Sequence, residues 1–414
     1  MKNIIKIIPF AILIMTWKSV AQWMNFDIFL GGWWIEHILC FMLPLSFVVY
    51  YKYNSIKLQK APIIFKIFFL ILFCNVIYGF YMIDGYNDFL LMASKILAWS
   101  LCVGWFYFQE PKNVAKVTSL WCKYSIPLFF VLMVFMQGEA IGRFFAPFGF
   151  VLIFFPYLKK TWKTKIILVV LLVLLIGSLD ARSSVIRYGV AILLALAIYF
   201  QKKIPSLLIK LLFVIFVVSP IVFLILGITE QFNIFKFKEE FGLKDIEVSS
   251  SFDNGEKSDL TEDTRTFLFI EEINSAITHD YVTFGRSIGR GYDSVTIGGV
   301  DWIAGRNERW SSEVRFLNVF NYMGLVGVVI VGLLYIIGAW KAVFQSNSFA
   351  MQMIGLYVAF RWLYGWIEDF DRFDLINLYL WIPIFMCYSQ KFLNMNDTEI
   401  KIWIKELFKP QRVC

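Results

Sequence analysis

Long apolar stretches alternate with short polar connections along most of the chain. An α-helix needs about 20 mostly apolar residues to cross the hydrocarbon core of a bilayer, and somewhat fewer when flanking side chains reach back to the headgroups. The pattern predicts twelve such helices, over residues 4–22, 35–51, 62–82, 88–108, 118–137, 143–158, 164–179, 186–201, 207–228, 315–340, 348–367 and 374–390. We therefore expect an all-α integral membrane protein.

One polar segment, residues 229–314, is too long to be a simple connection between two helices. Its middle, SSSFDNGEKSD, is polar, whereas TEDTRTFLFIEEINSAIT predicts a helix begun by a capping residue such as Thr261 or Asp263. The turn VTFGRSIGRGYDS follows, with several glycines and two arginines. The predicted organisation is nine spans in 1–228, a large external loop with short helices in 229–314, three spans in 315–390 and a basic tail in 391–414.

The lysines predict how the chain is oriented in the membrane. Of the 27 lysines, 21 lie in alternate connections or in the span ends beside them, and cytoplasmic connections carry an excess of basic residues. Both termini are therefore predicted to be cytoplasmic and the large loop external. The first residues, MKNIIKIIPFAILIMTWKSV, are typical of a signal anchor, although Ser19-Val20-Ala21 resembles a cleavage site.

The arginines are distributed in the opposite way. Only one of the twelve, Arg412, falls on the predicted cytoplasmic side. The guanidinium group is planar and binds phosphate or carboxylate through two parallel hydrogen bonds. The sequence therefore predicts an anion-binding site at the external face of the membrane.

Composition narrows the class of protein. The chain of 414 residues is 59% hydrophobic, against about 45–50% in soluble domains, so an ordinary globular protein is excluded. The net charge of +8 resides mostly on cytoplasmic lysines, which favours anionic lipid headgroups over nucleic acid as a partner. None of the six cysteines lies in the large loop and only two histidines are present, so we expect no disulfide framework, no metal site and no cofactor.

Two segments place arginines where a phosphate group can bind. In FGRSIGRGYDS, Arg286 and Arg290 lie among glycines, so guanidinium and backbone N–H groups can converge on a diphosphate. The alternative is a surface turn with solvated arginines. In LDARSSVIR, Arg182 and Arg187 lie at the outer ends of spans, where an arginine usually has a partner or a functional role. A structural pair with Asp180 is the alternative there.

Two further charged clusters border the last spans. NERWSSEVRF contains Glu308, Arg309, Glu313 and Arg315, and a carboxylate beside an arginine can serve as a base or as a counter-ion. Arg361 lies inside an apolar stretch and precedes a charged cluster. That cluster consists of Glu368, Asp369, Asp371, Arg372 and Asp374. We interpret Arg361 and this cluster as structural, because opposite charges in a short loop readily pair.

Taken together, three stretches resemble the bacterial O-antigen polymerase and O-antigen ligase superfamily of integral membrane glycosyltransferases. GSLDARSSVIRYGVAILLALAI is similar to the Ser-Arg motif of that family, with Arg182 as the motif arginine. DTRTFLFIEEINSAITHDYVTFGRSIGRGYDS resembles the loop arginine, helix and glycine turn, with Arg265 and Gly289 or Gly291 in these places. SSEVRFLNVFNYMGLVGVVIVGLL resembles the return into the membrane. The matching positions there are Leu317, Gly324 and Gly327.

The resemblance implies a polymerase of polyprenyl-diphosphate-linked oligosaccharide repeat units, for O-antigen or capsular polysaccharide, at the periplasmic face of the bacterial inner membrane. It implies a lipid-linked donor and acceptor, no metal, no nucleotide sugar, and a flippase and a chain-length regulator as partners. Arginines suit this chemistry because they stabilise the charge that develops on the diphosphate leaving group. The expected diphosphate-binding residues are Arg182, Arg187, Arg286, Arg290 and Arg315. Arg265 and Glu313 are the expected catalytic residues, with Glu313 as the general base.

Two alternatives are consistent with the same pattern. Ligases of this superfamily, which transfer glycan to the lipid A core, typically have His-Asn where this chain has Glu313 and Val314, and His279 lies elsewhere. This difference favours a polymerase. A lipid-linked oligosaccharide flippase belongs to a different class and also needs many spans and arginines. Transporters usually carry ionisable residues along a central path, whereas the central spans here are nearly free of charge, with Lys95 and Arg361 as the clearest exceptions.

Overall fold

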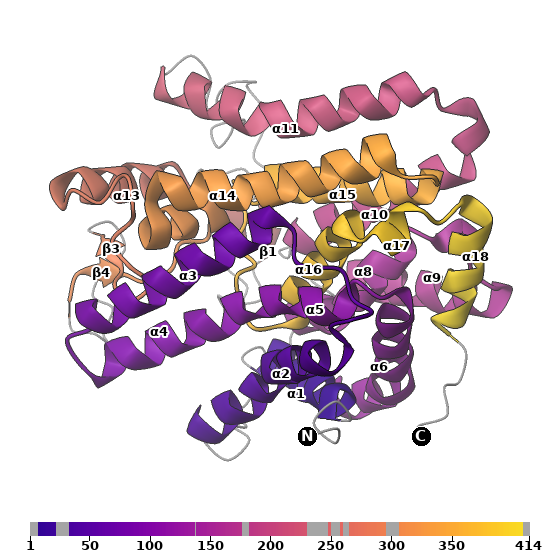
Figure 1. The fold of residues 1–414 in the computed structure, drawn as a ribbon, viewed down its shortest axis with the longest axis horizontal. Helices are drawn as coiled ribbons and strands as arrows, with labels where there is room; N and C mark the ends of the chain where they lie inside the picture. The colour runs from indigo at the N-terminus through magenta and orange to yellow at the C-terminus, as the bar shows by residue number, and fades with distance from the viewer. Residues whose placement is uncertain are drawn as a thin grey trace.

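The computed structural model describes residues 7–21, 33–136, 138–175, 182–229, 247–249, 257–259, 265–294 and 306–408. Within these ranges the fold is helical, and two short antiparallel strand pairs are the only sheet structure (Figure 1). The all-α prediction is therefore confirmed. The candidate capping residues Thr261 and Asp263, and also Asp180, lie outside the described ranges.

The helices follow one another along the chain with few long connections. The first half contains α1 (Ile8–Ala21), α2 (Trp33–Asn54), α3 (Ile63–Met82), α4 (Tyr86–Trp99), η2 (Ser100–Gly104), α5 (Trp105–Phe108), α6 (Pro111–Leu132), α7 (Gly138–Phe144), α8 (Ala146–Leu152), η3 (Phe155–Tyr157), α9 (Lys160–Leu175) and α10 (Arg182–Tyr199). The second half contains η4 (Gln201–Lys203), α11 (Ser206–Ile228), α13 (Thr266–Thr278), α14 (Arg315–Gln345), α15 (Phe349–Tyr364), α16 (Leu375–Tyr388), α17 (Gln390–Leu393) and α18 (Asp397–Glu406). The strands are β1 (Glu247–Ser249), β2 (Lys257–Asp259), β3 (Tyr292–Asp293) and β4 (Glu308–Arg309), and they pair β1 with β2 and β3 with β4.

Four helical segments of the described chain are long and apolar enough to cross a membrane: Ile63–Met82, Tyr86–Phe108, Ser206–Gly227 and Arg315–Gln345. Each coincides with a predicted span, which supports a membrane protein, whereas the number twelve stays a prediction. The predicted span 143–158 is not one continuous helix. It is divided among α7, α8 and η3, and Pro147 and Pro156 each lie in the first turn of a segment, where no backbone N–H has to be donated.

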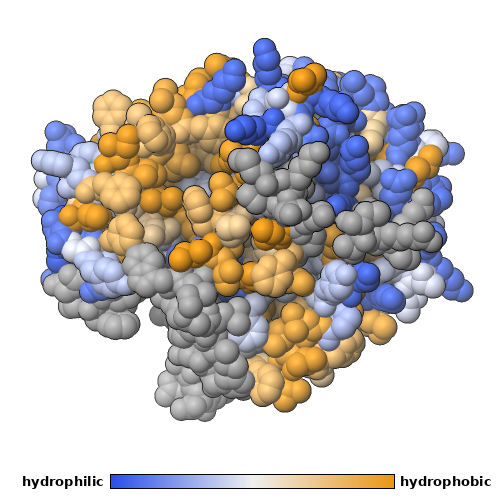
Figure 2. All heavy atoms as spheres, turned by 60° about the horizontal axis from the view of Figure 1, so that its bottom comes forward, coloured by the Kyte–Doolittle hydropathy of each residue, from blue (hydrophilic) through white to orange (hydrophobic). Residues whose placement is uncertain are grey.

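Apolar side chains cover a large part of the surface. Along α3 and α11 the exposed residues include Leu70, Phe73, Leu207 and Leu211. Another face, brought forward from the bottom of Figure 1, also carries a broad apolar area beside a strongly polar one (Figure 2). Soluble monomers rarely expose apolar patches of this extent. These faces therefore fit contact with lipid.

The two ends of the helix bundle are built from different sets of connections. At the end that carries α13, β3 and β4 (Figure 1), the α3–α4 connection meets the large loop, where Arg290 lies 3.1 Å from Asp84. Arg143 lies 3.5 Å from Asp374, and the Lys95 ammonium donates to the Ser311 hydroxyl at 2.9 Å. Apart from Lys95, which lies within a predicted span, these residues belong to segments or span ends that the lysine pattern predicts to be external.

The opposite end joins segments predicted to be cytoplasmic. The backbone amide of Gln59 donates to the Gln109 side chain at 2.7 Å, and Lys391 forms an ion pair with Glu110. Nearby, α18 is fixed by the Trp403 indole, which donates to the carbonyl of Pro111 at 2.8 Å. The chain thus sorts its connections into two groups that agree with the predicted sidedness.

A break at Gly324 divides α14 into two helices. Gly324 has φ 63° and ψ −162°, so the helical hydrogen bonds stop there. The next two amides find acceptors in the external turn, since Leu325 donates to Val282 at 2.9 Å and Val326 donates to Thr283 at 3.2 Å. The turn that follows α13 therefore completes the backbone bonding of a broken membrane helix.

Asn75 of α3 joins the same junction. Its side-chain amide donates to the carbonyl of Tyr322, and its oxygen accepts from the amide of Ile288 at 3.0 Å. A single buried side chain thus links α3, the short first part of α14 and the glycine turn. This junction fixes the large loop to the membrane helices.

We expect Gly324→Ala to destabilise the protein, because a Cβ there would overlap the backbone of Thr283 and because a positive φ strains any other residue. The free energy of unfolding should fall by about 1–3 kcal/mol, measured as a lower melting temperature in detergent. Gly85→Ala is the matched control, since nothing lies within 4 Å of its Cβ position. Equal melting temperatures for the two variants would contradict the role of the junction.

Candidate functional site

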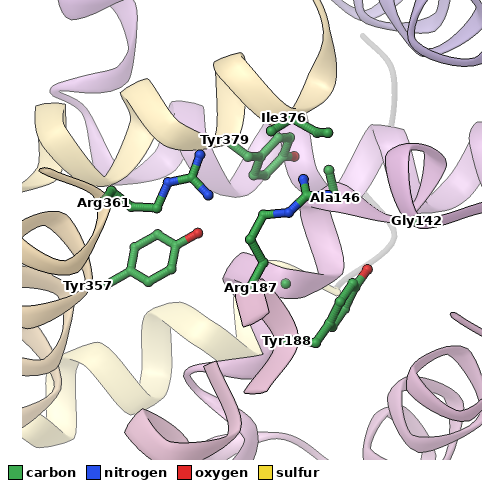
Figure 3. Close-up of a pocket in the computed structure, with 9 residues that line it drawn as sticks. Gly142, Ala146, Arg187, Tyr188, Tyr357, Arg361, Ile376 and Tyr379 are labelled. Atoms are coloured by element: carbon green, nitrogen blue, oxygen red, sulfur yellow. The ribbon is translucent and has the colours of Figure 1, made fainter. Parts of the chain in front are cut away.

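A pocket that is partly open to solvent lies between α7, α8, α10, α15 and α16, with a cavity volume of about 20 Å³. Its lining residues are Gly142, Ala146, Gly149, Arg187, Tyr188, Tyr357, Arg361, Ile376 and Tyr379. Two arginines and three tyrosines therefore provide its polar side chains, and no carboxylate is among the described residues that line it. Figure 3 shows the side chains of Arg187 and Arg361 entering the same space, with the Tyr357 hydroxyl pointing into it.

Arg361 is the unusual member of this pocket. Its side chain is on α15 and only 1% of the residue is exposed, yet Nε and Nη2 have no hydrogen-bond partner in the described chain. The guanidinium lies 4.0 Å from the ring centre of Phe370. A ring face supplies about 0.5–2 kcal/mol, whereas leaving a buried charge unpaired costs about 3–5 kcal/mol. The pocket is therefore suited to an anionic ligand.

The helices around the pocket are tied to one another by buried hydrogen bonds. The Tyr188 hydroxyl donates to the carbonyl of Phe145 at 2.8 Å, which fixes α10 against the α7–α8 connection. The Tyr379 and Thr118 hydroxyls are 3.2 Å apart and connect α16 to α6. Arg187 and Arg361 thus project from elements whose relative positions are fixed.

A second group of charges surrounds Arg265, which directly precedes α13. Its Nη2 lies 3.4 Å from Glu313 and 3.8 Å from Glu368, and its Nε donates to the carbonyl of Ile367 at 2.9 Å. The structure therefore brings together Arg265 and Glu313, the two expected catalytic residues. Glu313 also lies 4.0 Å from Arg309, and its side chain is 57% exposed.

Glu368 belongs to the same group of charges. It lies in the turn after α15, and its side chain is 27% exposed. Burial raises the pKa of the Glu368 carboxyl, while the charges of Arg187 and Arg265 oppose this rise. We call Arg265, Glu313 and Glu368 the Arg265 cluster.

The other expected diphosphate-binding arginines of the large loop lie in a separate network. Arg290 Nε donates to both oxygens of Glu308 at 3.1 Å, and Arg286 Nη1 lies 2.7 Å from Asp293. Arg306 joins the network through Asp88 at 2.9 Å. These guanidinium groups already have carboxylate partners, so they hold the loop to the α3–α4 connection.

The glycine turn does not present free backbone donors either. The amides of residues 286–291 all have acceptors, on the turn itself or on Asn75, Glu308 and Asn321. The expected cradle for a diphosphate is therefore not formed by these amides. The alternative prediction, a surface turn with solvated arginines, does not hold for Arg286, because Arg286 and the neighbouring Ile288 are buried.

Arg315 and Arg182 complete the set of expected residues. Arg315 is fully buried, lies 2.9 Å from Asp371 and has the Phe370 ring centre 4.8 Å from its guanidinium. Burial raises the pKa of Asp371 to about 7, against the opposing charge of Arg315. This pair is internal to the bundle. Arg182 begins α10, and its side chain lies outside the described part of the structure.

Sequence reasoning interpreted Arg361 and Glu368 as structural, on the argument that charges in one short loop pair with one another. In the structure the carboxylates pair elsewhere, since Asp371 meets Arg315 and Asp374 meets Arg143. The signal that identifies Arg361 was present, namely an arginine inside an apolar stretch. Nothing in the sequence shows which partner each carboxylate takes.

The described residues include no group of three or more His, Cys, Asp or Glu side chains placed to hold a metal ion. The pocket offers guanidinium and phenol groups instead, which are hydrogen-bond donors. Its chemistry is therefore that of anion binding.

Glu308→Gln should destabilise the protein, because Glu308 is the shared partner of Arg286, Arg290 and Arg306. Removing one partner of a buried pair costs about 3–5 kcal/mol, so unfolding at pH 7 should require clearly less denaturant or heat.

The pH dependence of this loss of stability follows from the pKa of Glu308. Burial raises this pKa, but the hydrogen bonds from Arg290 and the charges of all three arginines outweigh burial, so the pKa is lowered. A carboxyl group whose pKa is lower in the folded protein than in the unfolded protein stabilises the fold at pH values above the unfolded-state pKa. This stabilisation is lost as the pH falls through the folded-state pKa. The difference in stability between Glu308→Gln and wild type should therefore shrink below pH 4.5, which is the ordinary pKa of a glutamate side chain. A constant difference would contradict the assignment.

Comparison of the chain with protein-family models, with curated proteins and with solved structures finds no match. The features that bear on a function are therefore those of the chain itself. They are the pocket of Arg187 and Arg361, which no carboxylate of the described residues lines, and the Arg265 cluster of Arg265, Glu313 and Glu368.

Proposed function

We propose that the chain is a membrane glycosyltransferase that polymerises polyprenyl-diphosphate-linked oligosaccharide repeat units of O-antigen or capsular polysaccharide. The pocket of Arg187 and Arg361 would hold the diphosphate of the donor. One observation carries the proposal: Arg361 is buried, lacks hydrogen-bond partners on Nε and Nη2 among the described residues, and faces a pocket that none of the described carboxylates lines. A phosphate group bound there satisfies these two nitrogens of Arg361.

The pocket residues suit the departure of a diphosphate. As the anomeric bond breaks, negative charge grows on the leaving oxygen. Guanidinium groups and tyrosine hydroxyls that are already in place stabilise this charge more in the transition state than in the ground state. The fixed helices around Arg187 and Arg361 supply such positioning.

The Arg265 cluster suits the acceptor. Arg265 and Glu313 come from the two ends of the large loop, and Glu368 comes from the connection between α15 and α16. In this proposal a glycan hydroxyl binds at this cluster while the donor diphosphate binds in the pocket. In this proposal the reaction takes place at the periplasmic face of the bacterial inner membrane, with both termini of the chain in the cytoplasm.

A flippase is the second candidate, and the break in α14 favours it. Transporters often bind their substrate at helices that are interrupted within the membrane. Here the second part of α14 is bonded to the turn after α13 through the amides of Leu325 and Val326, and Arg315 on the first part is paired internally with Asp371. These contacts favour a structural role for the break, and therefore the polymerase.

Arg361→Met should abolish activity without loss of stability. Methionine fills similar space, and removing a buried charge is neutral or stabilising. With a lipid-linked donor and purified protein, the transfer rate should fall by about 10²–10³-fold, while the melting temperature stays equal or rises. Arg372→Gln, an exposed arginine in the α15–α16 connection, is the control and should retain activity. Normal turnover by a stable Arg361→Met variant would refute the anion site.

The reaction class is tested by deleting the gene in its host and examining the surface polysaccharide on a gel. Loss of the long ladder with one core-linked repeat remaining identifies a polymerase. Loss of every core-linked repeat while polymer accumulates on its lipid carrier identifies a ligase. Accumulation of unpolymerised lipid-linked repeats on the cytoplasmic face identifies a flippase. Complementation with Arg187→Met and Arg361→Met should fail in the polymerase case.

A further inference from the structure

The exposed side of α13 carries a stripe of isoleucines. Ile270, Ile273 and Ile277 are spaced three and four residues apart, so they lie on one face of the helix. Their exposed fractions are 55%, 38% and 66%. Asn274 and Thr278 are exposed beside these isoleucines and carry no charge. We call the three isoleucines the α13 stripe.

The charged side chains of α13 are on its protein side. Glu271 and Glu272 are the only charged residues between Thr266 and Thr278. Glu272 is fully buried and accepts a hydrogen bond from the Tyr281 hydroxyl at 3.3 Å, and Glu271 accepts one from the Ser294 hydroxyl at 2.7 Å. A helix on a soluble protein turns its apolar face to the core and its charged face to water. The arrangement in α13 is the reverse, which indicates an apolar surrounding for the stripe.

The turn after α13 joins this helix to one that is long and apolar enough to cross a membrane. α13 lies beside α14 at one end of the bundle, and the two helices are in contact (Figure 1). Phe284 of the turn is 74% exposed, and the preceding residue, Thr283, accepts a hydrogen bond from the Val326 amide at 3.2 Å. On α14 itself, Leu325 and Val329 are exposed. Exposed apolar side chains therefore follow one another from α13 through the turn to the second part of α14.

The same turn also packs against the end of α3. A Cβ atom on Gly289 would lie 2.6 Å from the carbonyl oxygen of Gly79, so the two backbones are in direct contact. Beside Gly79, the rings of Tyr78 and Tyr81 stack on each other and are exposed. Exposed tyrosines at the end of a membrane helix are typical of the membrane–water interface. The turn that follows α13 is therefore at the level of that interface.

We propose that the α13 stripe contacts the hydrocarbon of the lipid bilayer on the side of the large loop. The inference does not depend on the proposed function. The 13 residues of α13 rise about 20 Å as a helix, which is too short to cross a hydrocarbon core of about 30 Å. A helix of this kind binds a bilayer with its apolar face while its other face remains outside the lipid. The large loop is then held to the membrane by α13 as well as by the Gly324 junction.

The test places single nitroxide labels on the full-length protein in nanodiscs of phosphatidylethanolamine and phosphatidylglycerol. The six native cysteines are replaced by alanine, and Ile273→Cys, Ile277→Cys and Phe284→Cys are labelled one at a time. Val329→Cys on α14 is the control for a site in lipid. Lys57→Cys, exposed in the polar connection between α2 and α3, is the control for a site in water. Electron paramagnetic resonance measures how often each label collides with oxygen, which concentrates in hydrocarbon, and with a water-soluble nickel complex.

We expect the labels at 273 and 277 to behave like the label at 329, with several-fold fewer nickel collisions and more oxygen collisions than the label at 57. Two results would overturn the proposal. Nickel collisions as frequent as at 57 mean that the stripe faces water. Infrequent collisions with both reagents mean that protein covers the stripe instead of lipid. A melting temperature close to that of the cysteine-free protein shows that a variant is folded, and if one site fails this check, the other sites on α13 and its turn give the same reading.

Discussion

A helix that stops inside a membrane bundle leaves backbone amides that must find acceptors, because hydrocarbon offers none. The rest of this structure depends on how that requirement is met at Gly324. Val282 and Thr283 supply the acceptors, and Asn75 of α3 bonds to both sides of the junction. The large loop is therefore held directly on the apolar helices, and one of its arginines, Arg265, is held beside the α15–α16 connection.

Charge pairing then decides which arginines can bind a ligand. At the end of the bundle that carries α13, carboxylates form ion pairs with arginines that hold the structure together. Examples are Glu308 with Arg290 and Asp371 with Arg315. Arg361 receives no such partner within the described residues. Within the described part of the chain, the pocket therefore lies where carboxylates are missing, and a count of charges along the chain does not reveal it.

Local patterns predicted the local features well. The apolar runs correspond to α3, α11 and α14, and a helix was predicted where the structure has Thr266–Thr278. Arg265 precedes that helix and forms no side-chain cap, while the predicted caps Thr261 and Asp263 lie outside the described residues. The choice of Arg265 and Glu313 as neighbours in function agrees with their 3.4 Å separation. Pairs such as Arg290 with Asp84 could not be predicted, because no periodicity relates segments so far apart in the chain. The break in α14 could not be predicted from Gly324 either, because glycine is common in membrane helices.

The partners at the Gly324 junction also bear on biosynthesis. Val282 and Thr283 leave the ribosome shortly before the apolar part of α14, and Asn75 has left long before. Contacts between segments close in sequence form faster than distant ones. The acceptors for the broken helix are therefore already synthesised when its second half enters the bilayer, so its free amides need not wait for the final helices of the chain to be made.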